Sequence, residues 1–408
     1  MEPKSPGHSP QHRKRGKRSY LETQIPDTST QSSSTPEPDL AFPPLLPEIL
    51  LEILSRLPVK SLLKFRCVSK SWRDLISSSD FVKLHLYVSS SRRDYADHRI
   101  LSSLVGLQFT LKQCSLKSVM FHPVTEAFEV DYPLSSPYNS VWVVGSCNGL
   151  VCIAIEEKDL FIWNPATRKI KNLPDAGVEL KAGFYFIYGF GYDELNDDYK
   201  VVGIFSIFHS SGSCETEVMS YSLRSDSWRI IGDCKGGVLL NAAGKYVNGK
   251  IHWAMCPDGV TGSLEIVSLD LSKEVFGKVG QPDYGERPSE LTLGVLCGDL
   301  CVICQYEMYQ MDLWVMREYG VVESWTKIVA IPPTDDPMYQ SFSSPLGIGN
   351  NGEVGLVSGT DIVVYDPKTQ ALRYPEITNF GDILEAETYV ESLVSPISDG
   401  EAGRNQQS

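Results

Sequence analysis

Three cysteines, Cys297, Cys301 and Cys304, are the residues with the clearest potential for metal chemistry. Cys301 and Cys304 form a Cys-x-x-Cys pair, a spacing at which two thiolates can bind zinc. A zinc site also needs a second Cys or His pair at a suitable spacing, and the sequence lacks one here. In a β-strand, residues three apart point to opposite faces of the sheet. We therefore predict that these cysteines are buried free thiols and that they bind no metal.

The acidic run Asp193, Asn196, Asp197 and Asp198 has the composition of a calcium loop. Its spacing lacks the central glycine and the distant glutamate of an EF-hand. The run is therefore predicted to be a hairpin between two strands.

Two histidines, His122 and His252, lie beside aromatic residues in strand-like segments. Neither has an evident nucleophile as a partner, so packing or a hydrogen bond is the expected role. The sequence also has no phosphate-binding Gly-Lys-Ser/Thr run and no nucleophile elbow. These residues give no support to an enzyme on the strand-rich segment, which stays an open alternative, and no cofactor is expected.

The composition predicts a folded chain of more than one domain. The 408 residues are 42% hydrophobic and 22% charged, and the net charge is −14. The acidic part of the chain begins after residue 86, which disfavours nucleic-acid binding. No apolar run is long enough to span a membrane, and the N-terminus has no apolar stretch typical of a secretory signal. We expect a location in the cytoplasm, the nucleus or both, where scattered cysteines stay reduced.

Residues 43–87 have the pattern of a small helical domain. Pro47 and Glu48 suit the first turn of a helix, and Pro58 ends that helix. Apolar residues recur between them at steps of three and four, which gives one broad apolar face. The members of this face are Leu46, Ile49, Leu50, Ile53, Leu54 and Leu57.

Three further short helices are predicted after Pro58. One carries Val59, Leu62, Leu63 and Phe65, the next carries Val68, Trp72, Leu75 and Ile76, and the last begins after Ser79 or Asp80. About 40 residues make only a marginal core. Part of the apolar surface must therefore contact another domain or a partner, which indicates a docking module.

Residues 88–396 contain an internal repeat of short strands. Each copy is a strand, a polar turn and a second strand, and the copies begin at Phe121, Trp163, Tyr221, Leu269, Trp314 and Tyr365. A strand pair marked by glycine precedes most copies, as at Asn148-Gly149 and Asn248-Gly249, where positive φ angles suit tight hairpins. The spacing of about 40 to 60 residues is typical of four-stranded propeller blades. We predict an all-β propeller of about six blades.

The two ends of the chain, residues 1–42 and 397–408, are predicted to be disordered tails. The first tail contains a basic cluster that is either a nuclear-import signal or a solvated segment. Its members are Arg13, Lys14, Arg15, Lys17 and Arg18.

The helical segment from Leu45 to Leu86 resembles the F-box. The residues that carry the resemblance are Leu46-Pro47-Glu48-Ile49, Leu57-Pro58-Val59 and the run from Phe65 to Trp72. The order of leucines, prolines and the distal tryptophan makes this a specific motif.

The strand-rich segment is similar to the F-box-associated, kelch-like domain of a large plant family. The motifs include the runs 145–150, 163–167, 189–193, 198–202, 247–253 and 323–327. Pollen S-locus F-box proteins resemble the same architecture.

These resemblances imply the substrate-recognition subunit of a Skp–cullin–F-box ubiquitin-protein ligase. Such a subunit docks on the Skp adaptor, and through it on the cullin and the RING subunit, while its propeller binds a protein substrate for ubiquitination. It performs no bond chemistry and acts by proximity. By matching position, the implied adaptor contacts are Leu46, Pro47, Ile49, Leu50, Ile53, Leu54, Leu57, Pro58, Leu62, Leu63 and Val68.

Two other functions stay open. The chain could be an adaptor-bound scaffold that never joins a cullin, or a glycan-binding propeller tethered by an F-box. Repeated aromatic residues are the only support for glycan binding, and such residues more often pack in a core. Trp72 is likewise expected to pack inside the helical domain.

Overall fold

The computed structural model describes residues 46–104, 108–136, 138–156, 158–178, 184–208, 214–234, 238–240, 243–257, 264–306, 310–333 and 342–397. All of them belong to one compact unit, Leu46–Ser408. The predicted N-terminal tail up to residue 42, with its basic cluster, lies outside the described residues, as does all but the first residue of the predicted tail 397–408. The predicted boundary between residues 87 and 88 stays a prediction.

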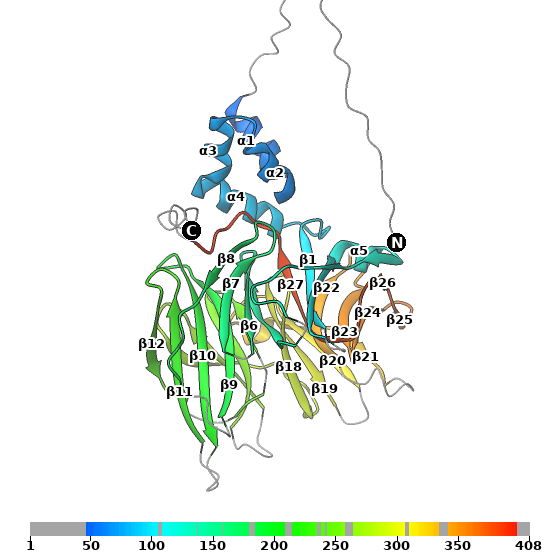
Figure 1. Cartoon of the computed structure of the whole chain (residues 1–408). Helices are drawn as coiled ribbons and strands as arrows, with labels where there is room; N and C mark the ends of the chain where they lie inside the picture. Colours follow the sequence, from blue (N-terminus) through cyan, green and yellow to red (C-terminus); the bar gives the residue numbers. More distant parts are fainter. Residues whose placement is uncertain are drawn as a thin grey trace, which may run out of the picture. The chain divides into compact units, whose positions relative to one another are not determined.

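Four helices come first, as predicted (Figure 1). They are α1 (Pro47–Ser55), α2 (Val59–Phe65), α3 (Lys70–Ser77) and α4 (Ser79–Ser90). Pro58 separates α1 from α2, because a proline cannot donate the hydrogen bond that would continue the helix.

Two serines determine where the later helices begin. The Ser69 Oγ accepts a hydrogen bond from the Trp72 N–H at 3.2 Å, and the Ser78 Oγ accepts one from the Phe81 N–H at 3.3 Å. Such caps satisfy backbone donors that have no partner within the helix. The prediction that Val68 lies in the third helix is therefore wrong, because the cap at Ser69 places Val68 in the preceding turn.

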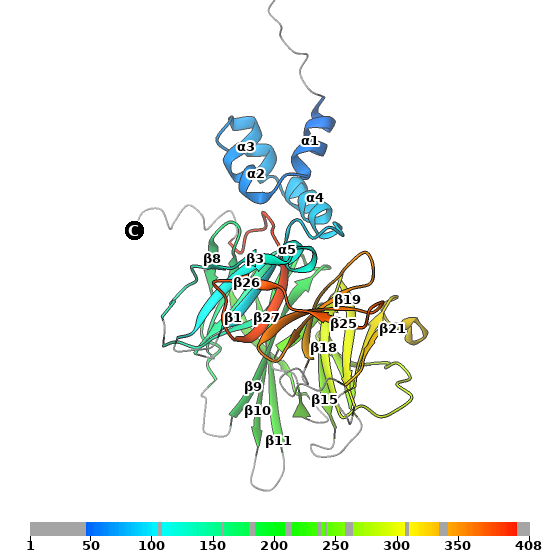
Figure 2. The ribbon, with the colours of Figure 1, turned by 90° about the vertical axis from the view of Figure 1, so that its right-hand side faces the viewer.

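Strands dominate the rest of the chain, in a propeller-like arrangement (Figures 1 and 2). Three of the sheets each consist of four consecutive strands. The first contains β5 (Val141–Cys147), β6 (Leu150–Ile155), β7 (Asp159–Asn164) and β8 (Lys169–Asn172). The second contains β18 (Glu290–Leu296), β19 (Asp299–Gln305), β20 (Met311–Met316) and β21 (Trp325–Ile331), with the 3₁₀ helix η2 (Val322–Ser324) before β21. The third contains β22 (Phe342–Ile348), β23 (Val354–Ser358), β24 (Asp361–Asp366) and β25 (Ala371–Arg373).

A nine-stranded sheet joins two further runs of strands. One run contains β9 (Phe184–Asp193), β10 (Asp198–Phe208), β11 (Cys214–Ser222) and β12 (Ser227–Gly232). The other contains β14 (Ala243–Val247), β15 (Lys250–Cys256), β16 (Glu265–Asp270) and β17 (Val275–Val279), and β13 (Val238–Leu239) pairs with β15. A short parallel pairing of β9 with β14 connects the runs.

The two ends of the strand region meet in one sheet. Its order is β27 (Ile383–Val390), β1 (His98–Leu104), β2 (Thr110–Ser115) and β4 (Phe128–Glu129). The helix α5 (Leu116–Phe121) follows β2, and β3 (Val124–Glu126) pairs in parallel with β26 (Glu376–Thr378). Figure 2 shows β27, from the end of the chain, beside β1.

The first strands of neighbouring sheets contact one another in a closed series: β27 with β5, β5 with β9, β9 with β14, β14 with β18, β18 with β22 and β22 with β27. The series closes because β27, from the end of the strand region, pairs with β1 from its start. Because the pairing of β9 with β14 merges two runs, sheets do not correspond one to one with blades, and the count of about six stays a prediction.

Except for the copy at Phe121, the repeat found in the sequence corresponds to two kinds of hairpin. The prediction for that copy is wrong, because Phe121 ends α5 and the strands after it, β3 and β4, pair with β26 and β2 and not with each other. Asn148-Gly149 and Asn248-Gly249 form two-residue turns with positive φ at both positions, as predicted, and Cys297-Gly298 forms the same turn. The polar turns of the repeat end on a residue in the left-handed region. These residues are Arg168, Asp226, Glu274 and Gln370.

The core is divided among clusters that lie between neighbouring sheets. One cluster joins β19, β20 and β21 with β23 and β24, and includes Leu313, Val329 and Leu356. Trp163 and Trp253 are fully buried. As expected, no sheet buries both of its faces alone.

Candidate docking surfaces

The helical domain has a small core of its own. Leu54, Val59, Leu62, Ile76 and Phe81 are buried together, and Trp72 packs against them. The Trp72 ring meets the Phe65 ring edge to face, with the centroids 5.5 Å apart. The prediction that Trp72 packs internally is confirmed.

The residues implied as adaptor contacts divide into three groups by burial. Leu54 and Leu62 are 1% and 0% exposed and belong to the core. Leu50, Leu57 and Leu63 are half-buried against it. Pro47 and Pro58 are exposed. Four apolar side chains are exposed as well, with exposed fractions of 62% for Leu46, 46% for Ile49, 46% for Ile53 and 62% for Val68. Adaptor contact itself stays a prediction for all eleven residues.

Three of the exposed residues form a row on α1. Leu46, Ile49 and Ile53 follow one another at steps of three and four, so they share one face of the helix. The core lies on another face, where Leu54 is buried. This apolar row has no covering side chain in the core cluster and is open to a partner.

The helical domain also carries basic residues on and between α2 and α3. Lys60, Lys64, Lys70 and Arg73 are exposed, whereas Arg66 is half-buried and burial lowers the pKa of its guanidinium. These charges are compatible with an acidic partner and equally with a solvated helix face.

A segment from the end of the chain completes the helical core. Leu393 is 5% exposed and lies in the same cluster as Leu54 and Phe81. We call residues 391–397 the strap. No sequence pattern linked this segment to the helices, because no local pattern reports a contact so distant along the chain.

Polar contacts hold the strap on the propeller. The Asn164 Nδ2 donates to the carbonyl oxygens of Ser392 and Val394 at 3.0 and 2.7 Å. The Ser392 Oγ donates to the Asn148 carbonyl at 2.8 Å. Gly149 allows this approach, since a Cβ there would lie 2.3 Å from the Ser392 Oγ. The strap therefore connects the helical core to the turns of the first propeller hairpins.

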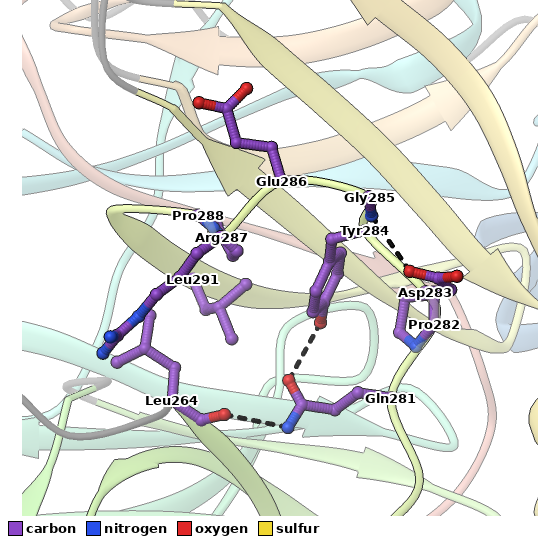
Figure 3. Close-up of a pocket in the computed structure, with 10 residues that line it drawn as sticks. All are labelled: Leu264, Gln281, Pro282, Asp283, Tyr284, Gly285, Glu286, Arg287, Pro288 and Leu291. Carbon is purple, nitrogen blue, oxygen red and sulfur yellow. Dashed lines mark hydrogen bonds between the residues drawn. The ribbon is translucent and has the colours of Figure 1, made fainter.

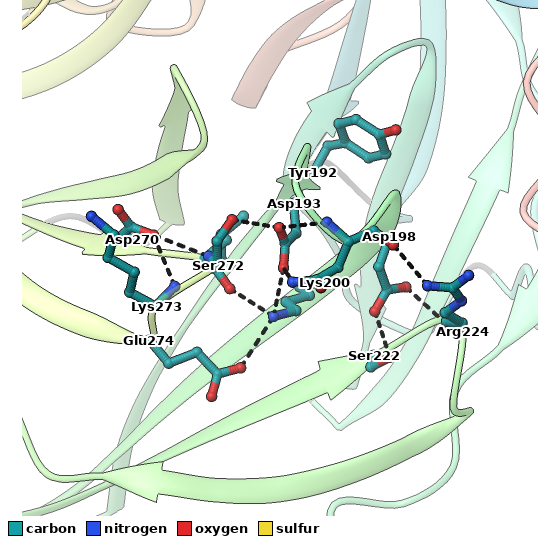
Figure 4. A network of polar contacts seen from close by, with 12 residues as sticks. Tyr192, Asp193, Asp198, Lys200, Ser222, Arg224, Asp270, Ser272, Lys273 and Glu274 are labelled. Carbon is teal, nitrogen blue, oxygen red and sulfur yellow. Dashed lines mark hydrogen bonds and ion pairs between the residues drawn. The ribbon is translucent and has the colours of Figure 1, made fainter.

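A buried polar network joins the two runs of the nine-stranded sheet (Figure 4). The Lys200 Nζ lies 3.0 Å from the Asp193 Oδ2 and 3.2 Å from the Glu274 Oε1, and it donates to the Leu271 carbonyl. Lys200 and Asp193 have side chains that are 7% and 0% exposed. Burial opposes ionisation of Asp193, but hydrogen bonds from Ser272, Asn196 and Lys200 outweigh it and lower its pKa to about 2.

The same network shows the structure of the acidic run that has the composition of a calcium loop. Asp193 ends β9 and Asp198 begins β10, so the run is a hairpin, as predicted. The Asp193 carboxylate accepts from Lys200 and Ser272, and Asp198 accepts from Ser222 and the Arg224 N–H. Within the described ranges, no group of three or more His, Cys, Asp or Glu residues could hold a metal ion.

The prediction of buried free thiols is confirmed for Cys301 and Cys304 and is wrong for Cys297, which lies in a turn. Cys301 and Cys304 are both buried on β19, but they belong to different core clusters on opposite faces of the sheet. Both are free thiols, whereas Cys297 is exposed in the turn before β19.

His252 has the packing role expected of it. Its Nδ1 lies 3.0 Å from the Lys245 carbonyl oxygen, and its Nε2 lies 2.8 Å from the Tyr319 hydroxyl. Burial lowers the pKa of His252 to about 4, so the ring is neutral at neutral pH. His122 caps the end of α5 and is exposed.

A second charge pair, with half-buried side chains, lies between β14 and β27. The Lys245 Nζ is 2.7 Å from the Glu387 Oε2. Burial alone would lower the pKa of Lys245, but attraction to Glu387 raises it. Burial raises the pKa of the neighbouring Glu385 to about 6.

One surface pocket lies beside the loop between β17 and β18 (Figure 3). It has a volume of about 450 Å³, and Leu264, Tyr284 and Leu291 form part of its wall. The Tyr284 hydroxyl donates to the Gln281 Oε1 at 3.0 Å, and the Gln281 Nε2 donates to the Leu264 carbonyl at 2.8 Å. No sequence motif marked this loop as a candidate binding element.

The fold and the helical surface together define a class: a small helical docking domain followed by a β-propeller. Family models agree with this division. The F-box domain model matches residues 44–84, and the F-box associated beta propeller domain model matches residues 104–379. The chain belongs to the plant F-box proteins that carry this propeller domain.

Relatives with the same two parts extend over most of the chain. The Arabidopsis thaliana F-box/kelch-repeat protein At3g23880 is 33% identical over 356 residues, which cover 86% of this chain and 95% of that protein. The Arabidopsis thaliana F-box protein CPR1 is 29% identical over 374 residues, covering 85% and 88%. Among solved structures, one of a nidogen/laminin complex matches with 9% identity and a TM-score of 0.45, covering 72% of this chain and 99% of that one.

No helix in the described part of the chain is both long and apolar enough to cross a membrane.

Proposed function

We propose that this protein is the substrate-recognition subunit of a Skp–cullin–F-box ubiquitin-protein ligase. The F-box docks on the Skp adaptor, and the propeller binds a protein substrate. A conjugating enzyme that carries ubiquitin can then reach the lysines of the substrate. The receptor itself performs no bond chemistry.

The apolar row on α1 carries this proposal. A domain of four short helices would bury Leu46, Ile49 and Ile53 if its own core had room for them, and instead they are exposed. Apolar anchors that are covered only in a complex are typical of the centre of a protein interface. The match to the F-box domain model supports a Skp-type adaptor as the partner that covers this row.

Binding to the adaptor tests the proposal directly. We expect the double variant Ile49→Ala, Ile53→Ala to lose co-purification with the Skp adaptor, because truncating central anchors costs about 2 kcal/mol or more each. Both side chains are exposed, so the fold should survive, which circular dichroism would verify. Ile230→Ala, an exposed isoleucine on β12, serves as the matched control. Undiminished adaptor binding by the double variant would refute the assignment.

Assembly with the cullin distinguishes a ligase subunit from an adaptor-bound scaffold. We expect purified complexes to contain the cullin and the RING subunit beside the adaptor. We also expect proximity labelling under proteasome inhibition to enrich substrate proteins. Complexes that contain the adaptor but never a cullin would favour the scaffold.

The proposed site of action is the cytoplasm, the nucleus or both. Replacing the basic cluster Arg13–Arg18 with alanines tests its role in nuclear import. A fluorescent fusion of the full chain would redistribute toward the cytoplasm if the cluster is an import signal.

A further inference from the structure

A cavity of about 750 Å³ lies at the propeller turns, beside the segment that follows α4. Its wall comes from that segment, from the turns between β5 and β6, β18 and β19, and β22 and β23, and from β27. Small-molecule sites in proteins commonly have volumes of this size. Elements from distant parts of the sequence therefore converge on a space large enough for an organic ligand.

The wall combines apolar and cationic groups. Leu116, Val295 and Leu346 supply apolar surface, while Arg92, Arg93 and Arg317 supply positive charge. Asp299 is the acidic residue of the wall. A positive wall is unusual in a chain of net charge −14, and a concave surface concentrates its field.

The three arginines differ in the ion pairs that they already make within the protein. Arg92 pairs with Asp94 at 3.1 Å and with Asp97 at 3.4 Å, so it is committed to carboxylates outside the cavity. Arg317 makes a looser pair with Asp299 at 3.6 Å. Arg93 makes no ion pair or hydrogen bond with any described residue. Arg93 therefore has all its donors available to a ligand.

Neighbouring groups keep the cavity wall in place around Arg93. The Tyr95 hydroxyl donates to the Ile348 carbonyl at 2.9 Å and accepts from the Ile348 N–H at 2.8 Å. Burial raises the pKa of this hydroxyl, and the nearby Arg93 charge offsets part of that increase. The Cys297 thiol lies 3.4 Å from the same hydroxyl and is exposed on the wall.

From this arrangement we propose that the cavity binds a small organic anion, with a phosphate or carboxylate group on Arg93 and Arg317 and an apolar body against Leu116, Val295 and Leu346. A guanidinium matches the oxygen pairs of both groups through two parallel hydrogen bonds. The proposal concerns the propeller side of the chain and does not depend on adaptor binding.

Thermal unfolding of the full chain with phenyl phosphate as the probe tests the proposal. At constant ionic strength, we expect a saturable rise in Tm that inorganic phosphate and phenol each reproduce only in part, because each lacks one half of the ligand. Arg93→Gln should weaken binding by about tenfold or more, as expected for a lost charged hydrogen bond. Arg168→Gln, an exposed arginine outside the cavity, should bind as the unaltered protein does.

Two results would overturn the proposal: equal affinity of the Arg93→Gln and unaltered proteins, or equal stabilisation by phenol and phenyl phosphate. A phosphotyrosine peptide that binds more tightly than phenyl phosphate would replace the small molecule with a protein ligand and would also overturn it.

Site-resolved alkylation locates the ligand without relying on any variant. Cys297 lines the cavity, whereas Cys67, the other exposed cysteine of the described residues, follows α2 in the helical domain. Phenyl phosphate should slow alkylation of Cys297 and leave that of Cys67 unchanged. Equal rates at Cys297 with and without the probe would place any binding elsewhere.

Discussion

The helical domain and the propeller differ in which side chains they bury: the helices leave apolar side chains exposed, whereas the propeller buries charged ones. The helices leave Leu46, Ile49 and Ile53 exposed on α1. The propeller instead buries the charges of Lys200 and Asp193 and half-buries those of Lys245 and Glu387. The helical domain is too small to cover its own leucines, whereas the propeller is large enough to surround ion pairs and satisfy them.

The two regions also differ in whether their cores need residues from elsewhere in the chain. The helices take Leu393 from the strap into their core and still leave one face open. The propeller closes on itself through the pairing of β27 with β1. Its stability therefore depends on internal pairs, and three predictions test that difference.

The largest effect is expected at Lys200. Lys200→Met should lower the free energy of unfolding by about 3–5 kcal/mol, because it leaves Asp193 buried without its cation, whereas Glu274 keeps its pair with Arg229. Urea unfolding followed by tryptophan fluorescence measures the loss. Lys278→Met removes an exposed lysine paired with Glu265 at 2.7 Å and should cost about 1 kcal/mol or less. Similar losses in both variants would remove the distinction between buried and surface pairs.

The next effect concerns the strap. Leu393→Ala should destabilise the helical core by about 2–4 kcal/mol, because it removes a buried side chain and leaves a cavity. Hydrogen exchange should accelerate in α1–α4 and stay unchanged in β18–β21. Leu384→Ala, at a position on β27 that is 38% exposed, is the matched control with a small expected effect. Unchanged exchange in the helices would show that their core is complete without the strap.

The smallest effect is a dependence on pH. The pKa of His252 is lowered to about 4 in the fold, against about 6.5 when unfolded, so the unfolded chain binds the proton first as the pH falls. The contribution of His252 is fully present above pH 6.5 and is lost between pH 6.5 and 4. This amounts to about 2 kcal/mol between pH 7 and pH 5.

Urea unfolding at several pH values measures this slope, and His252→Gln should reduce it. His85 is the corresponding histidine of the helical domain: burial lowers its pKa, and its Nε2 bonds the Leu57 carbonyl at 2.9 Å. His85→Gln should reduce the slope as well. A slope that neither variant changes would assign the pH dependence to other groups.

The sequence predicted the local elements well. The four helices follow from apolar spacing and from Pro47 and Pro58, and the Asn-Gly turns follow from their preference for positive φ. It also predicted that Cys301 and Cys304 face opposite sides of a strand, since alternation in a strand has a period of two. The position of Val68 was wrong because two helix starts were possible near Ser69, and only the observed cap chooses between them.

By itself, therefore, the sequence determined the kinds of element, their order and the family resemblance, because each of these depends on residues that are close together along the chain. Only the tertiary structure decided which implied adaptor contacts are exposed and which, like Leu54 and Leu62, are core. It alone placed Leu393 among the helices and brought Arg93 and Arg317 to one cavity. Such contacts join residues hundreds of positions apart, and their energy depends on packing and burial that no local pattern records.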